Sequence, residues 1–157
     1  MPAITPAGEP RLIIPAFEPF YALVRDLSYL VIRLTAGGML LVHGITKLST
    51  TTVTAFAAGS LARRGLEPSL PLAYVVFFLE TVGAICIILG LLTRLFVVMV
   101  GIEFLIIVFL AHWPQGFGWS RPGGGWEYPL FWGLIFFAIG LRGGGPYSLD
   151  RKLGWEI

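Results

Sequence analysis

The sequence predicts an all-α polytopic membrane protein: a four-transmembrane-helix bundle with a short interfacial helix between spans 1 and 2. Composition is the first reason. Of the 157 residues, 56% are hydrophobic and 13% are charged, whereas a soluble domain carries about 25% charged residues. The mean hydropathy is +0.82. A surface of this kind is solvated by lipid better than by water.

Four apolar stretches are the predicted spans, and they cover residues 27–48, 70–92, 95–111 and 126–141. A hydrocarbon core about 30 Å thick is crossed by roughly 20 helical residues at 1.5 Å per residue. The first two stretches reach that length. The fourth is the shortest, and glycines at 123–125 and 143–145 mark its ends.

The connections between the spans predict how the helices are arranged. Spans two and three are joined only by Leu92-Thr93-Arg94, which predicts an antiparallel hairpin. Apolar residues recur through 50–65 with a spacing that suits a short helix lying in the membrane interface. The connection after span three holds three of the five tryptophans, as an aromatic belt would: Trp113, Trp119 and Trp126.

The chain divides into a proline-rich cytoplasmic or interfacial tail (1–26), the transmembrane domain (27–142) and a short cytoplasmic C-terminal tail (143–157). Five prolines among residues 1–20 predict a mostly extended segment rather than a cleaved signal peptide. Lys and Arg are more numerous on the side that carries both termini. The positive-inside rule therefore places the N- and C-termini in the cytoplasm.

Charged residues inside the spans are the first group of candidate site residues, since each costs about 2.5–3.5 kcal/mol on insertion scales. Arg33 lies in span one, Glu80 near the centre of span two and Glu103 near the centre of span three. We predict that they form one buried polar cluster, with Arg33 reaching Glu80. The same cluster fits a purely architectural role, in which a buried ion pair sets helix register, and Glu80 could equally be neutralised by desolvation.

A second group is the candidate pocket, predicted at the opposite face of the membrane. His43 and Lys47 are four residues apart and share one side of span one. His112 closes span three and Glu127 opens span four at the same face. Together they predict an outward-facing pocket rimmed by tryptophans. The alternative is that Lys47 only snorkels and His112 only caps the interface.

Other chemistries have little support. The single cysteine, Cys86, cannot form a disulfide within the chain. A net charge of +2, with no basic run longer than Arg63-Arg64, argues against a nucleic-acid partner. No metal site is expected, and no glycine-rich loop precedes a helix with the lysine of a phosphate-binding motif.

Several motifs resemble the DoxX family of four-helix membrane proteins. They are Arg33 with Gly37-Gly38 and His43-Gly44-x-x-Lys47, then Glu80-x-x-Gly83 leading to Leu89-Gly90-Leu91-Leu92-Thr93-Arg94, and finally Gly143-Gly144-Gly145-Pro146-Tyr147-Ser148-Leu149-Asp150. The similar DoxD proteins are subunits of a thiosulfate:quinone oxidoreductase, and many members have no assigned activity. The resemblance implies a redox-associated subunit in a bacterial-type inner membrane.

The leading hypothesis is a subunit of a redox or respiratory assembly that offers a quinone-interacting pocket within the lipid bilayer. His43, Lys47 or Arg33 would donate hydrogen bonds to quinone carbonyls, and Glu80 or Glu103 would relay protons. No intrinsic cofactor is expected and no residue is assigned a catalytic role. Other membrane subunits, or further copies of the chain, are the expected partners.

Four alternatives remain open at this point. The main one is a non-catalytic accessory or assembly subunit that docks a larger membrane complex. The others are bis-histidine haem ligation by His43 and His112, thiol–disulfide exchange at Cys86, and small-solute transport by an oligomer.

Overall fold

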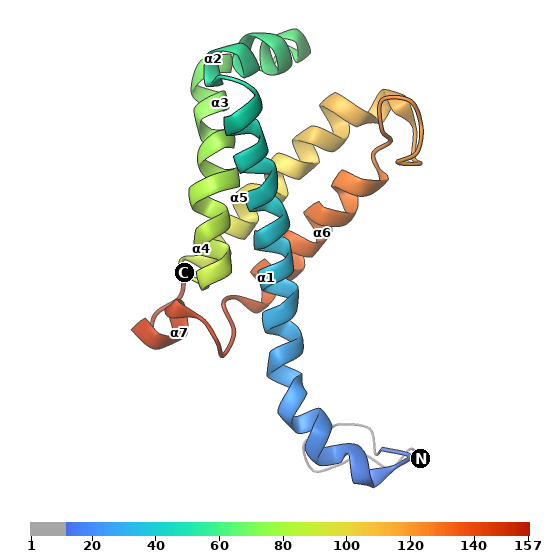
Figure 1. Cartoon of the computed structure of the whole chain (residues 1–157), viewed down its shortest axis with the longest axis vertical. Helices are drawn as coiled ribbons and strands as arrows, with labels where there is room; N and C mark the ends of the chain where they lie inside the picture. Colours follow the sequence, from blue (N-terminus) through green and yellow to red (C-terminus); the bar gives the residue numbers. More distant parts are fainter. Residues whose placement is uncertain (1–11) are drawn as a thin grey trace.

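Residues 12–157 are described by a computed structural model, and all regular elements within that range are helical, which confirms the all-α class. The α-helices pack as a bundle, and the N-terminal part of the first helix extends beyond the others at one end (Figure 1). In chain order the α-helices are α1 (Glu18–Thr50), α2 (Val53–Phe56), α3 (Ser69–Phe78), α4 (Ala84–Leu89), α5 (Thr93–Ile107), α6 (Glu127–Arg142) and α7 (Leu149–Leu153). Shorter turns are 3₁₀ at Pro15–Phe17, Ala62–Arg64 and Trp113–Gln115, and π-helical at Ala57–Leu61, Leu79–Gly83 and Val108–His112.

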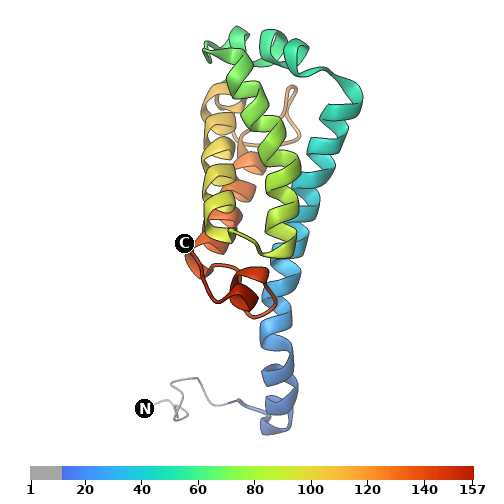
Figure 2. The same cartoon turned by 90° about the vertical axis from the view of Figure 1, so that its left-hand side faces the viewer.

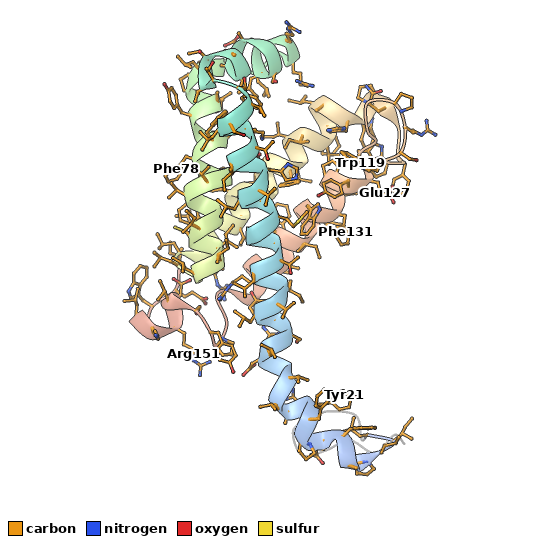
Figure 3. All side chains as sticks on the ribbon, viewed as in Figure 1. Tyr21, Phe78, Trp119, Glu127, Phe131 and Arg151 are labelled. Atoms are coloured by element: carbon orange, nitrogen blue, oxygen red, sulfur yellow. The ribbon has the colours of Figure 1, made fainter. Side chains whose placement is uncertain are left out.

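In the described part of the chain, three continuous helical segments are long and apolar enough to cross a membrane, judged by length and composition. They are Pro15–Thr50, Ser69–Leu89 and Thr93–Gln115, and they coincide with three of the predicted spans. Many of their large apolar side chains are exposed on the outside of the bundle, as Phe78 illustrates in Figure 3. The fourth predicted span corresponds to α6, which has 16 residues.

The first helix begins earlier than the sequence predicted. α1 starts at Glu18 rather than at Leu27, and its 33 residues make it about 50 Å long. Of the segment expected to be extended, residues 1–11 lie outside the described part of the chain, and from Pro15 onward the backbone is helical. The reason is that Pro15 and Pro19 fall in first turns, where proline is compatible with a helix.

The second and third spans form the predicted antiparallel hairpin. α3 and α4 are joined through the π-helical turn Leu79–Gly83 into one rod, which ends at Gly90 with φ +70°. Leu92 also has a positive φ of 48°, and α5 begins at Thr93. The reversal is therefore completed in three residues, from Gly90 to Leu92.

Small residues set the distance between the helices, as membrane helix packing requires. On α1, a Cβ added to Gly37 would lie 2.7 Å from Ile88, and one added to Gly44 would overlap the carbonyl oxygen of Glu80. Between α5 and α6, a Cβ on Gly101 would meet the ring of Phe137 at 2.9 Å. The backbone of α1 therefore lies close to the backbone of the α3–α4 rod, whereas on α5 the missing side chain of Gly101 makes room for an aromatic ring of α6.

Each end of the bundle is covered by a different segment. At one end, the helical stretch 53–64 runs crosswise over the helix ends (Figure 1), with Ala57 and Leu61 buried against Ala73 of α3. At the other end, α7 and the C-terminus lie beside the α4–α5 turn (Figure 2). A short helix between spans one and two is therefore present, and its location in a membrane interface remains a prediction.

Candidate functional site: a lysine and two carboxylates between two cavities

Lys47 and Glu80 form an ion pair inside the bundle. The Lys47 ammonium contacts Oε1 of Glu80, and the exposed fractions of the two side chains are 26% and 5%. The ammonium also lies 5.3 Å from the centre of the Phe56 ring, a cation–π contact. Lys47 therefore has an anionic partner on one side and an aromatic face on the other.

The backbone explains why these two residues meet. Gly44 lies against the backbone of Glu80, and Lys47 is close to one helical turn beyond Gly44 on the same side of α1. Glu80 itself lies in the π-helical turn Leu79–Gly83. Such turns insert one extra residue into a helix and occur frequently at functional sites.

Glu103 of α5 supplies a second buried carboxyl group. It is 8% exposed, and neither of its oxygens has a hydrogen-bond partner within residues 12–157. Oε2 of Glu80 is likewise buried without a partner in that range. Buried polar atoms are nearly always satisfied by protein or by water. Three unsatisfied carboxyl oxygens in one region therefore indicate a place where a ligand, water or a proton binds.

The larger of two neighbouring cavities exposes Glu103 and Lys47. Its volume is about 460 Å³, and its walls come from α3, α5 and the crosswise segment, a size within the roughly 300–1,000 Å³ of ligand pockets. Thirteen of the lining residues are apolar or aromatic, and the four polar ones are Lys47, Ser60, Arg64 and Glu103. Of these four, Arg64 is exposed and donates a hydrogen bond to the carbonyl oxygen of Ser60 at 2.7 Å.

The smaller cavity adjoins the first and is more polar. Its volume is about 170 Å³, and Lys47 and Ile107 line both cavities. The other lining residues are Leu40, His43, Glu80, Phe104, His112, Trp119, Tyr128 and Pro129. His43, Lys47 and His112 of the predicted pocket are thus brought together, in company with Glu80 from the other predicted group.

Glu127, the fourth residue of the predicted pocket, lines neither cavity. Its Oε2 accepts a hydrogen bond from the backbone N–H of Trp119 at 3.1 Å, and the two residues lie together in Figure 3. Nδ1 of His112 lies 2.8 Å from the carbonyl oxygen of Gly124. Both side chains therefore hold the tryptophan-containing loop of residues 116–126 against the end of the bundle.

Arg33 is buried, with 2% exposure, but it lies apart from Glu80. Its guanidinium donates to the carbonyl oxygens of Gly144 and Tyr147, the latter at 2.5 Å. The expected Arg33–Glu80 pair is therefore replaced by Lys47–Glu80. Helix register is the cause. Gly44 faces Glu80, and Arg33 lies eleven residues closer to the N-terminus of α1, a distance of about 16 Å along the helix axis.

Asp150 is a structural residue whose role the sequence reasoning missed. It is 1% exposed, and its carboxylate accepts hydrogen bonds from the N–H groups of Leu92 and Thr93 at 2.7 and 2.9 Å, and from the Thr93 hydroxyl at 2.7 Å. It therefore caps the first turn of α5 from a distant part of the chain. The signal was the Gly143–Asp150 motif, which was noted only for its resemblance.

Among residues 12–157, no three His, Cys, Asp or Glu side chains lie close enough together to hold a metal ion. The cavity shared by His43 and His112, at about 170 Å³, is also smaller than typical organic-ligand pockets. The arrangement instead suits hydrogen bonding and proton exchange around Lys47, Glu80 and Glu103.

These features define a class: a helical membrane protein whose spans enclose a lysine and two carboxylates. The chain belongs to the DoxX family, since the DoxX family model matches residues 28–113, more than half of its length. That match includes Lys47, Glu80, Glu103 and His112, whereas Glu127 and Asp150 lie beyond it. Comparisons with curated proteins and with solved structures return no match.

Proposed function

We propose that this protein is a membrane subunit of a redox or respiratory assembly and that its larger cavity binds a quinone. One observation carries the proposal: a mainly apolar cavity of about 460 Å³ has in its wall Lys47 and Glu103, whose carboxyl oxygens have no hydrogen-bond partner among residues 12–157. A quinone needs an apolar cleft for its ring and tail and polar groups for its carbonyl oxygens. The cavity offers both.

The two polar groups have different roles in this proposal. The Lys47 ammonium donates a hydrogen bond to one carbonyl oxygen and stabilises negative charge that develops there during reduction. Glu103 serves as a proton donor or acceptor at the second oxygen. Reduction of a quinone to a quinol takes two electrons and two protons, and the electrons come from a partner protein that carries the redox centre.

The proposal includes four membrane crossings in a bacterial-type inner membrane, with both termini in the cytoplasm. The 16 residues of α6 extend about 24 Å, a little less than the hydrocarbon thickness, and tryptophans flank its start. Packing along α5 supports this crossing, since Gly133 and Gly140 of α6 lie against Phe104 and Val97. Reporter tags at the two ends test the topology, and a C-terminus outside the cytoplasm contradicts it.

Quinone binding is tested on the purified protein in lipid nanodiscs, by displacement of a labelled short-tailed ubiquinone analogue. Ile102→Trp fills the larger cavity from its exposed side, and Leu95→Trp adds the same ring to an exposed position on α5 that does not line the cavity. We expect Ile102→Trp to weaken binding at least tenfold and Leu95→Trp to leave it unchanged. No saturable binding by the unaltered protein refutes the proposal.

A second candidate function is that of an accessory subunit that docks a larger membrane complex. The first part of α1 favours it, because this stretch stands clear of the bundle in Figure 1 with Phe20, Leu23 and Leu27 exposed. Tyr21 lies on the same stretch in Figure 3. Co-purification from native membranes separates the two functions. The accessory role is favoured if a stoichiometric partner co-purifies with the unaltered protein and is lost from Leu23→Glu, while Glu103→Gln leaves the turnover of the assembly unchanged.

A further inference from the structure

The two cavities share Lys47 and Ile107, of which only Lys47 is polar, and their walls differ in chemistry. The larger has mainly aliphatic walls, whereas half of the residues around the smaller one are polar: His43, Lys47, Glu80, His112 and Tyr128. Glu103 faces the larger cavity and Glu80 the smaller, with Lys47 in the wall between them. Glu80 and Lys47 are also the charged groups that act electrostatically on Glu103.

The smaller cavity meets the physical requirements for water. A buried water needs room and two to four polar partners, and its share of liquid volume is about 30 Å³. At about 170 Å³, the cavity holds several. Oε2 of Glu80, which is 4% exposed overall, has no partner in the described chain and borders this space. His43 and Trp119 are both exposed, so the cavity opens at the surface.

We propose that the smaller cavity is an aqueous vestibule that supplies protons to the larger one through Glu80 and Lys47. The inference rests on the proposed function, because it assigns a proton source to the quinone cavity. In each transfer, the Lys47 ammonium gives a proton to the ligand oxygen, directly or by way of the Glu103 carboxylate, which accepts the proton and passes it on. The Glu80 carboxylate then accepts a proton from the aqueous phase through vestibule water and passes it to the neutral Lys47 amine, so one proton crosses and the ammonium and both carboxylates are restored.

His112 and Tyr128 are positioning residues in this scheme. His112 fixes the loop beside the vestibule through its contact with Gly124, and its ring lies 5.7 Å from that of Trp119. Tyr128, on the first turn of α6, forms part of the wall and packs on Trp119 with ring centres 4.8 Å apart. Together they keep a polar space open next to Glu80.

Cysteine accessibility tests the vestibule in a Cys86→Ser background, with the full chain in sealed vesicles. Tyr128→Cys reports on the vestibule, Ile102→Cys on the larger cavity and Leu134→Cys, an exposed position on α6, on the lipid face. A charged, water-soluble thiosulfonate reagent should modify Tyr128→Cys at least tenfold faster than the other two. Equal rates at Tyr128→Cys and Leu134→Cys overturn the inference.

A plug tests whether the route passes His43. His43→Trp fills the mouth, and Val42→Trp adds the same ring at the adjacent exposed position, which lines neither cavity. Modification of Tyr128→Cys should slow at least tenfold with His43→Trp and remain unchanged with Val42→Trp. Equal slowing by both substitutions contradicts the route.

Labelling of the carboxyl groups tests which side each faces. A water-soluble carbodiimide should modify Glu80 and a lipid-soluble one Glu103, as read by mass spectrometry of peptides. Modification of Glu80 only by the lipid-soluble reagent refutes the vestibule. These readouts need no quinone, so a failure of quinone binding leaves them interpretable, and an inaccessible Tyr128→Cys leaves the quinone proposal standing.

Discussion

The backbones of Gly44 and Glu80 are in direct contact, and this contact sets the level at which Lys47 reaches the Glu80 carboxylate. A Cβ on Gly44 would overlap the Glu80 carbonyl oxygen, whereas one on Gly38 would meet nothing within 4 Å. The two glycines lie on the same helix and differ only in what they face. They therefore form a matched pair for testing the packing.

We expect Gly44→Ala to destabilise the protein and Gly38→Ala to have little effect or to stabilise it. Overpacking typically costs about 1–3 kcal/mol, whereas glycine-to-alanine changes in an unobstructed helix gain about 0.5–1 kcal/mol. Thermal unfolding in detergent micelles measures both. A lower melting temperature for Gly38→Ala than for Gly44→Ala contradicts this packing of α1.

Loss of one member of the Lys47–Glu80 pair should cost more than loss of both. Lys47→Met leaves the buried Glu80 charge without its partner, at a cost of up to about 3–5 kcal/mol, reduced because Lys47 is 26% exposed. Glu80→Gln in the same chain removes that charge. The double variant should therefore recover about 0.5–3 kcal/mol in a double-mutant cycle. If the losses of stability in the two single variants simply add in the double variant, the pairing is contradicted. The control is the same cycle with Arg33→Met in place of Lys47→Met, for which the losses should add.

The cap on α5 gives a third expectation. Asp150→Asn retains the size of the side chain but weakens its acceptance of three hydrogen bonds, and loss of a helix cap costs about 0.5–2 kcal/mol. Asp26→Asn is the control, because Asp26 is half exposed and lies 3.9 Å from Arg142, where an ion pair contributes about 0–1 kcal/mol. Asp150→Asn should therefore lower the melting temperature clearly in a thermal unfolding measurement, whereas Asp26→Asn should change it little.

His112 should control the order of the tryptophan loop. His112→Ala removes the contact to Gly124, and we expect faster amide hydrogen exchange across residues 116–126. His43 lines the same cavity but makes no hydrogen bond to residues 116–126. His43→Ala should therefore leave amide hydrogen exchange in the loop unchanged. Hydrogen exchange with mass spectrometry distinguishes them, and equal protection in both variants contradicts the role given to His112.

Much of the architecture follows from sequence alone. Long apolar runs identify three helices, and the short link at Leu92-Thr93-Arg94 predicts that the second and third form a hairpin. Both features depend only on local composition and on the length of the connection. The burial of Arg33, Glu80 and Glu103 was likewise expected, because each lies within an apolar run. The N-terminal segment was predicted to be extended because it is rich in proline. Pro15 and Pro19 are nevertheless compatible with a helix, because each lies in a first turn.

The partners of the buried charges were decided by tertiary structure. From sequence, Glu80 was paired with Arg33, and Lys47 on the same helix was assigned to a separate pocket. The choice between these two cations depends on how far α1 is shifted along α3 and α4, and that register is set by backbone contact at Gly37 and Gly44. Asp150 likewise reaches Thr93 only after the chain has folded, because 57 residues separate them. Local patterns therefore determined which residues are buried, and the packing of distant backbones determined which of them meet.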